Sequence, residues 1–69
     1  MEFVLNGERK PLADGLTVSR LLEQLAIAPE RVVVEVNLAI LKRAQHGGTI
    51  LKEGDQVEIV HFVGGGDGR

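Results

Sequence analysis

Apolar and polar positions alternate at the start of the chain in the pattern of a β-hairpin. Residues 1–6 carry apolar side chains at the odd positions, which gives an extended strand one apolar face. Asn6 and Gly7 follow, and both residue types tolerate the positive φ angles of a type I′ turn. The returning strand, residues 8–12, contains Pro11, which has no N–H to donate to a neighbouring strand. We therefore expect a hairpin whose second strand lies at a sheet edge.

One segment has the period of an amphipathic helix. Thr17 is a suitable N-cap residue, and apolar side chains follow it at spacings of i, i+3, i+4 and i+7. Pro29 ends any helix by about Ala28, because a proline disfavours helical backbone in the residue before it. The chain is thus expected to hold one main helix, whose apolar stripe faces the core: Val18, Leu21, Leu22 and Leu25.

The second half of the chain contains the remaining strands. Residues 32–37 are rich in valine, residues 38–41 form a short apolar run, and residues 56–63 form a final strand. The segment between them, residues 42–48, is expected to be a loop. This order of elements predicts an α+β roll in which a mixed sheet of four to five strands packs against one main helix.

Strand alternation and the helical stripe must face one another, so together they predict the core. Glu58, Val60 and Phe62 fall on the other face of the sheet. We expect Val60 and Phe62 to form an exposed apolar surface for partner binding, since exposed apolar patches mark interaction sites. The alternative is that Phe62 folds back over the sheet edge. The predicted core residues are Phe3, Leu5, Val18, Leu21, Leu22, Leu25, Val32, Val34, Val57 and Ile59.

Length and charge narrow the class of protein. A chain of 69 residues makes one domain, which we place at residues 1–63, with a flexible glycine-rich tail at residues 64–69. A domain of this size buries only about 60% of its unfolded surface, which favours a binding or carrier module over an enzyme. The formal net charge of −2 argues against nucleic-acid binding. With no signal peptide and no apolar run of about 20 residues, we expect a cytoplasmic protein that does not enter membranes.

The residue types that usually carry catalysis are scattered. His46 is expected in an exposed loop, His61 in a structural position on a strand, and Ser19, the one serine, in the first turn of the helix. No base is spaced to activate that serine, and the histidines lack the convergent partners of a metal site. The chain has no cysteine, so it cannot form disulfides or carry a persulfide on a side chain.

The run of Gly64, Gly65 and Gly66 directly follows the apolar final strand. One interpretation is a frayed, permissive terminus. The other is a backbone thread, because a chain without side chains can enter a narrow channel in a partner protein. On that interpretation an activating enzyme could reach a glycine carboxyl group.

The sequence from Val57 to Gly66 resembles the C-terminal signature of the ThiS family, the sulfur carriers of the thiamin pathway. Further segments are similar to the rest of that family's pattern, at residues 1–7, 17–22, 34–37 and 51–55. The resemblance covers nearly the whole chain. It implies a ubiquitin-like β-grasp fold, which is also that of the small subunit of molybdopterin synthase.

The resemblance also implies a mechanism. An E1-like adenylyltransferase of the ThiF type would use MgATP to adenylate the carboxylate of Gly66, which Gly65 precedes. The carrier itself would hold no cofactor. A sulfur donor such as a cysteine desulfurase would supply sulfur, and the resulting thiocarboxylate would deliver it to a ThiG-type thiazole synthase. This chemistry needs no cysteine in the carrier, because the sulfur is carried on the chain terminus.

One feature departs from the family pattern. Asp67, Gly68 and Arg69 follow Gly66, which therefore has no free carboxylate. Three explanations remain open: a peptidase trims the tail, the extra residues are peculiar to this sequence, or the chain is a divergent, inactive homologue. Two alternative functions also remain. They are sulfur carriage for molybdopterin or cysteine synthesis, and a β-grasp interaction domain without thiocarboxylate chemistry.

Overall fold

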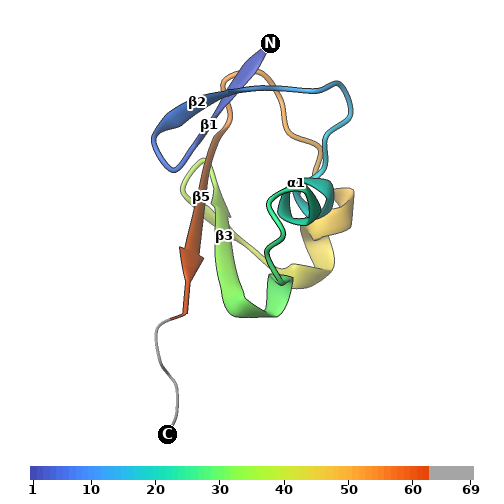
Figure 1. The fold of residues 1–69 in the computed structure, drawn as a ribbon, viewed down its shortest axis with the longest axis vertical. Coiled ribbons are helices and arrows are strands. Elements are labelled where there is room, and N and C mark those ends of the chain that lie inside the picture. The colour runs from blue at the N-terminus through green and yellow to red at the C-terminus, as the bar shows by residue number, and fades with distance from the viewer. Residues whose placement is uncertain (63–69) are drawn as a thin grey trace, which may run out of the picture.

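Residues 1–62, which the computed structural model describes, form a five-stranded β-sheet with one α-helix packed on it (Figure 1). This confirms the predicted α+β roll. The boundary predicted between residues 1–63 and 64–69 lies outside the described residues and stays a prediction. The elements in chain order are β1 (Glu2–Leu5), β2 (Glu8–Pro11), α1 (Val18–Gln24), the 3₁₀ helix η1 (Pro29–Arg31), β3 (Val32–Val36), β4 (Ala39–Leu41), the 3₁₀ helix η2 (Arg43–Gly48) and β5 (Gln56–His61).

The sheet is mixed, with the strand order β2-β1-β5-β3-β4. β5 lies at its centre, parallel to β1 and antiparallel to β3. The first hairpin forms as predicted, because Asn6 and Gly7 take φ angles of 49° and 85° in its turn. β2, which ends at Pro11, is an edge strand. The arrangement places the last strand in the middle of the sheet, where neighbours on both sides fix its direction.

α1 lies on one side of the sheet and encloses the core against it (Figure 1). Thr17 caps the helix, since its hydroxyl accepts a hydrogen bond from the Arg20 N–H at 3.2 Å. The predicted core residues are buried, with Leu25 as the exception. The buried apolar set is Phe3, Leu5, Leu12, Leu16, Val18, Leu21, Leu22, Val32, Val34, Leu51, Val57 and Ile59.

The prediction that Leu25 faces the core is wrong: α1 ends at Gln24, and Leu25 is its C-cap residue. Ala26 takes a left-handed φ of 58°, which turns the chain away from the helix axis. Its N–H donates to Glu23 O at 3.0 Å, and the Ile27 N–H donates to Leu22 O at 2.9 Å. This is the Schellman pattern of a helix C-terminus. Leu25 is left 40% exposed, and Ile27 packs against the core instead.

The segment predicted as a loop, residues 42–48, contains η2, and His46 within it is buried rather than exposed. The Lys42 N–H donates to Gln45 Oε1 at 3.0 Å, and the Thr49 hydroxyl donates to Gln45 O at 2.8 Å. A bridge between Thr17 and Ile50 then joins the segment to the start of α1. These local bonds close η2 into a compact turn that carries the buried His46.

Candidate functional site

The sheet has a second face that no helix of the described residues covers (Figure 1). Along β5 the side chains alternate, with Val57 and Ile59 buried beneath α1 and Glu58 exposed on the other side. Val60 and Phe62 are 53% and 63% exposed. Exposure on this scale is what a partner-binding role needs, and it argues against the alternative that Phe62 folds back over the sheet edge. Partner binding itself stays a prediction.

Strand register extends this apolar surface onto β3 and β4. Val60 lies directly opposite Val33. One row along, Glu35 is opposite Ile40 on β4, and directly paired residues share a face of the sheet. Ile40 is 68% exposed, and it lines one shallow depression together with Val33 and Phe62. We call the surface formed by Val33, Glu35, Ile40, Glu58, Val60 and Phe62 the open face.

The open face ends where the glycine tail begins. The Phe62 N–H donates to Arg31 O at 3.0 Å, so the residue that follows β5 is bonded to the residue that precedes β3. Gly64, two residues further on, lies outside the described residues, as do Gly65 and Gly66. The glycine run therefore follows closely in sequence after Phe62, the last residue of the open face, and the fold fixes the strand that precedes it.

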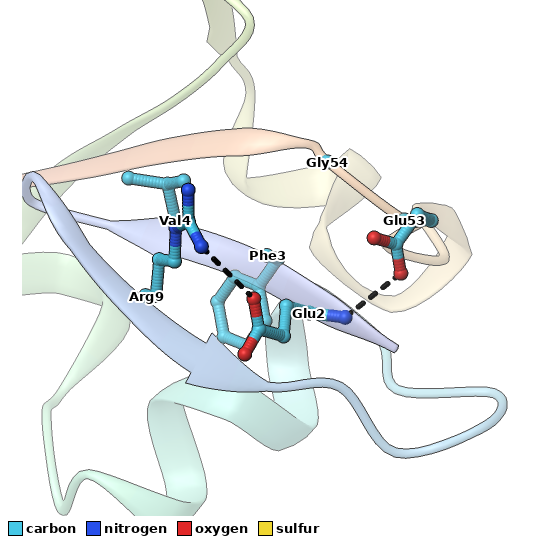
Figure 2. Close-up of a pocket in the computed structure, with 6 residues that line it drawn as sticks. All are labelled: Glu2, Phe3, Val4, Arg9, Glu53 and Gly54. Carbon is cyan, nitrogen blue, oxygen red and sulfur yellow. Dashed lines mark hydrogen bonds and ion pairs between the residues drawn. The ribbon is translucent and has the colours of Figure 1, made fainter.

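A second depression lies at another part of the sheet, lined by Glu2, Phe3, Val4, Arg9, Glu53 and Gly54 (Figure 2). Figure 2 shows Glu2 and Arg9 extended towards each other, with 3.9 Å between carboxylate and guanidinium. Glu53 Oε1 accepts a hydrogen bond from the Glu2 N–H at 2.8 Å. The polar groups thus bind one another, joining β1 to β2 and to the turn before β5. The lining contains no Ser, Thr, Cys, Lys or His, and its two glutamates are engaged in these contacts, so we assign the depression a structural role.

The isolated catalytic candidates lie on three different elements. Ser19 is half-buried on α1, and His61 is exposed at the end of β5. His46 is 4% exposed, and burial lowers the pKa of its imidazole; a hydrogen bond with the Leu41 backbone acts in the opposite direction, and the Arg43 charge lowers the pKa further. Within residues 1–62 no three His, Asp or Glu side chains gather as metal ligands would. In the same range no helix is long and apolar enough to cross a membrane.

Comparisons with known proteins agree with this geometry. The chain resembles the crystal structure of the thiamine biosynthesis protein ThiS from Geobacter metallireducens, with a TM-score of 0.79 and 40% identity over 96% of this chain and 100% of that one. It is 32% identical to the sulfur carrier protein ThiS of Escherichia coli, over 96% of this chain and 100% of its relative. The fold is that of a β-grasp domain. The model of the ThiS family matches residues 3–66, and the chain belongs to the ThiS family.

Two relatives are longer proteins. The chain is 47% identical to a thiazole synthase of Magnetococcus marinus and 38% identical to one of Paramagnetospirillum magneticum, in each case over 96% of this chain. It spans about a fifth of the length of these two synthases, since the matched segment covers 20% of each.

Proposed function

We propose that this chain is a sulfur carrier for thiazole synthesis in the thiamin pathway, a protein that enzymes load and unload rather than an enzyme. The observation that carries the proposal is the extent of the family match. It runs from Phe3 to Gly66 and so includes the open face and all three tail glycines. The proposed compartment is the cytoplasm, which supplies the MgATP that the loading step consumes.

The proposed chemistry takes place at the Gly66 carboxylate. One of its oxygens attacks the α-phosphorus of MgATP on an E1-like adenylyltransferase, which forms the acyl-adenylate and releases pyrophosphate. A sulfide equivalent then attacks the carbonyl carbon. If a cysteine desulfurase is the donor, it offers sulfur as a persulfide, and a thiol reductant releases the outer sulfur as sulfide while itself becoming a disulfide. AMP leaves, a proton is released, and the product is a thiocarboxylate. The absence of cysteine from the chain supports this route, because it leaves the terminus as the place for the sulfur.

The tail sequence favours a threaded terminus. Gly64, Gly65 and Gly66 have no side chains that would clash in a narrow channel. Asp67 follows them, so on this proposal a peptidase cleaves the chain after Gly66 before that residue can be adenylated. Gly66 is therefore the proposed reactive residue, and Gly64 and Gly65 are the residues that cross the channel.

Thiazole synthase is the proposed recipient of the sulfur. The support is that two relatives named thiazole synthase contain a segment similar to nearly this whole chain. A carrier segment within the synthase chain would keep donor and acceptor at high effective concentration. A thiazole synthase is thus a natural partner for this chain as well.

The proposed contact with the adenylyltransferase is the open face, through Val60 and Phe62. The test uses the chain ending at Gly66 and measures the ATP–pyrophosphate exchange that it stimulates on the adenylyltransferase. Phe62→Ala should raise the carrier concentration for half-maximal exchange by about tenfold or more. Loss of an aromatic side chain that becomes buried in an interface typically has an effect of this size. Its melting temperature should stay close to that of the parent, because the side chain is 63% exposed.

Leu38→Ala is the matched control. Leu38 is 88% exposed but lies in the β3–β4 turn, one residue after Asn37, which bonds to the start of β5. The Leu38→Ala variant should leave the ATP–pyrophosphate exchange unchanged. A parent chain that stimulates no exchange would contradict the proposed function, and equal exchange by Phe62→Ala and the parent would leave Phe62 without a role in binding.

A further inference from the structure

The open face combines exposed apolar side chains with two carboxylates in one place. Glu35 on β3 lies directly opposite Glu58 on β5. The residues beside them in sequence, Val34 and Ile59, are buried, so both glutamates point away from the core. Ile40 continues the same row on β4, and Val60 is the next residue on this side of β5. The acidic pair therefore borders the apolar side chains of this face, while the next residue on its other side along β5, Gln56, is polar.

This arrangement is unfavourable in the free protein. Like charges directly opposite each other on neighbouring strands destabilise a sheet. The ion pairs found among residues 1–62 join Arg9 to Glu2, Lys10 to Glu8, Arg20 to Glu23 and Arg43 to Glu30, so none of them involves Glu35 or Glu58. The surrounding apolar side chains are exposed as well, which adds a second unfavourable term. A partner that supplies positive charge and apolar contacts together would relieve both.

We propose that the open face recognises a basic side chain set among apolar ones on the adenylyltransferase. Arginine fits best, because its planar guanidinium carries five N–H donors and can bond two carboxylates at once. The guanidinium would lie between Glu35 and Glu58 while apolar neighbours pack on Ile40, Val60 and Phe62. This inference rests on the proposed function, and the adenylyltransferase is the chosen occupant because the open face leads directly through Phe62 into the glycine run.

The proposal predicts opposite effects on stability and on binding. Glu35→Gln and Glu58→Gln each remove one charge without changing the shape of the side chain. Either change should raise the melting temperature of the free protein by about 1–5 °C, because the repulsion disappears. Each should also weaken binding to the adenylyltransferase by about tenfold, and the dependence of affinity on salt should become shallower.

The matched control is Glu23→Gln, which removes the same charge from α1, on the covered side of the sheet, where Glu23 is paired with Arg20 at 3.7 Å. It should bind like the parent. In the double variant with Gln at positions 35 and 58, the loss of affinity should be smaller than the product of the two single losses, since both carboxylates bind one group. Binding is measured by isothermal titration calorimetry at two salt concentrations, with the chain ending at Gly66.

The outcomes separate this inference from the proposed function. If the parent binds the adenylyltransferase and the two Gln variants bind equally well, the inference is overturned and the carrier function stands. The inference is also overturned if Glu23→Gln weakens binding as much as they do, because overall charge would then account for the effect. If the parent does not bind, both the function and the inference fail. Weaker binding confined to the open-face variants, together with their higher melting temperatures, supports the inference.

Discussion

The carboxamide of Asn6 forms two hydrogen bonds with the backbone of Ile59, 53 residues further along the chain. The Ile59 N–H donates to Asn6 Oδ1 at 2.8 Å, and Asn6 Nδ2 donates to Ile59 O at 3.4 Å. The register of β1 with β5 ends at Leu5 opposite Val57, and the Asn6 N–H donates the last backbone bond, to Val57 O at 2.8 Å. Asn6 thus continues the ladder with its side chain where β1 turns away, and it holds the part of β5 that presents Val60.

Replacing Asn6 with Ala should destabilise the protein. The substitution leaves two backbone groups of Ile59 without these partners, which costs about 1–3 kcal/mol of unfolding free energy. The substitution also places alanine at a left-handed φ of 49°, which alanine adopts less readily than asparagine. Asn6→Asp should fall between the parent and Asn6→Ala, since it keeps an acceptor for the 2.8 Å bond. Urea denaturation measures all three, and an Ala variant within about 0.5 kcal/mol of the parent would contradict this role.

Ala26→Gly should stabilise the protein. Ala26 ends α1 in a left-handed conformation with a φ of 58°, which a glycine adopts without steric strain. The greater freedom of glycine in the unfolded chain offsets part of this relief, so we expect a net gain of about 0.5–1 kcal/mol. Ala28→Gly is the control, because Ala28 has an ordinary φ of −73°. This variant should be less stable than the parent, since glycine gains no relief of strain there. Thermal denaturation compares the two, and equal effects at both positions would rule out the strain at Ala26.

Stability should decline at mildly acidic pH because of His46. Burial lowers the pKa of its imidazole below 6.5, so the unfolded chain binds a proton more readily than the folded one. The stability that comes from keeping His46 neutral is therefore fully present above pH 6.5. It is lost as the pH falls from 6.5 towards the lowered pKa of the folded state. The unfolding free energy should drop by up to about 1.4 kcal/mol per pH unit in that window. Urea denaturation over this pH range measures the slope.

Two variants identify the group responsible for the slope. His46→Gln should make the unfolding free energy nearly flat across the same pH window, whatever its absolute stability. His61→Gln should keep the parent's slope, because His61 is exposed at the end of β5. A slope that survives in His46→Gln would assign the pH dependence to another group.

Much of the fold could be predicted because its signals are local. Asn6 and Gly7 have the φ preferences that their turn demands, and Pro11 excludes its strand from the sheet interior. The alternation along β5 likewise predicted which side chains are exposed, Val60 and Phe62 among them. In each case the residue type itself limits the backbone or the face.

What the sequence did not reveal depends on tertiary contacts. Leu12, Leu16 and Leu51 are buried although they lie outside the regular elements, where no periodicity marks them. The end of α1 was missed because Ala26 stands where a helix usually signals its end with glycine. His46 beside two glycines has the pattern of an exposed loop, and only the packing of the folded η2 segment buries it.

The open face was predicted only in part. Val60 and Phe62 follow from the alternation of one strand, but Ile40 and the pairing of Glu35 with Glu58 depend on the register between strands. Register is set by the whole sheet, and a shift of one residue would send these side chains to the other face. For the tail, by contrast, all the information comes from the sequence. It identifies Gly64, Gly65 and Gly66, which lie outside the described structure.

The most direct test of sulfur carriage is the intact mass of the chain after loading. Two forms, one ending at Gly66 and one continuing through Arg69, are incubated with the adenylyltransferase, MgATP and a sulfide source, and then analysed by mass spectrometry. The account predicts that only the form ending at Gly66 gains the mass of one oxygen-to-sulfur exchange, at its C-terminal residue. Equal conversion of the longer form without loss of residues would contradict the processing of the tail, and no conversion of either form would contradict sulfur carriage itself.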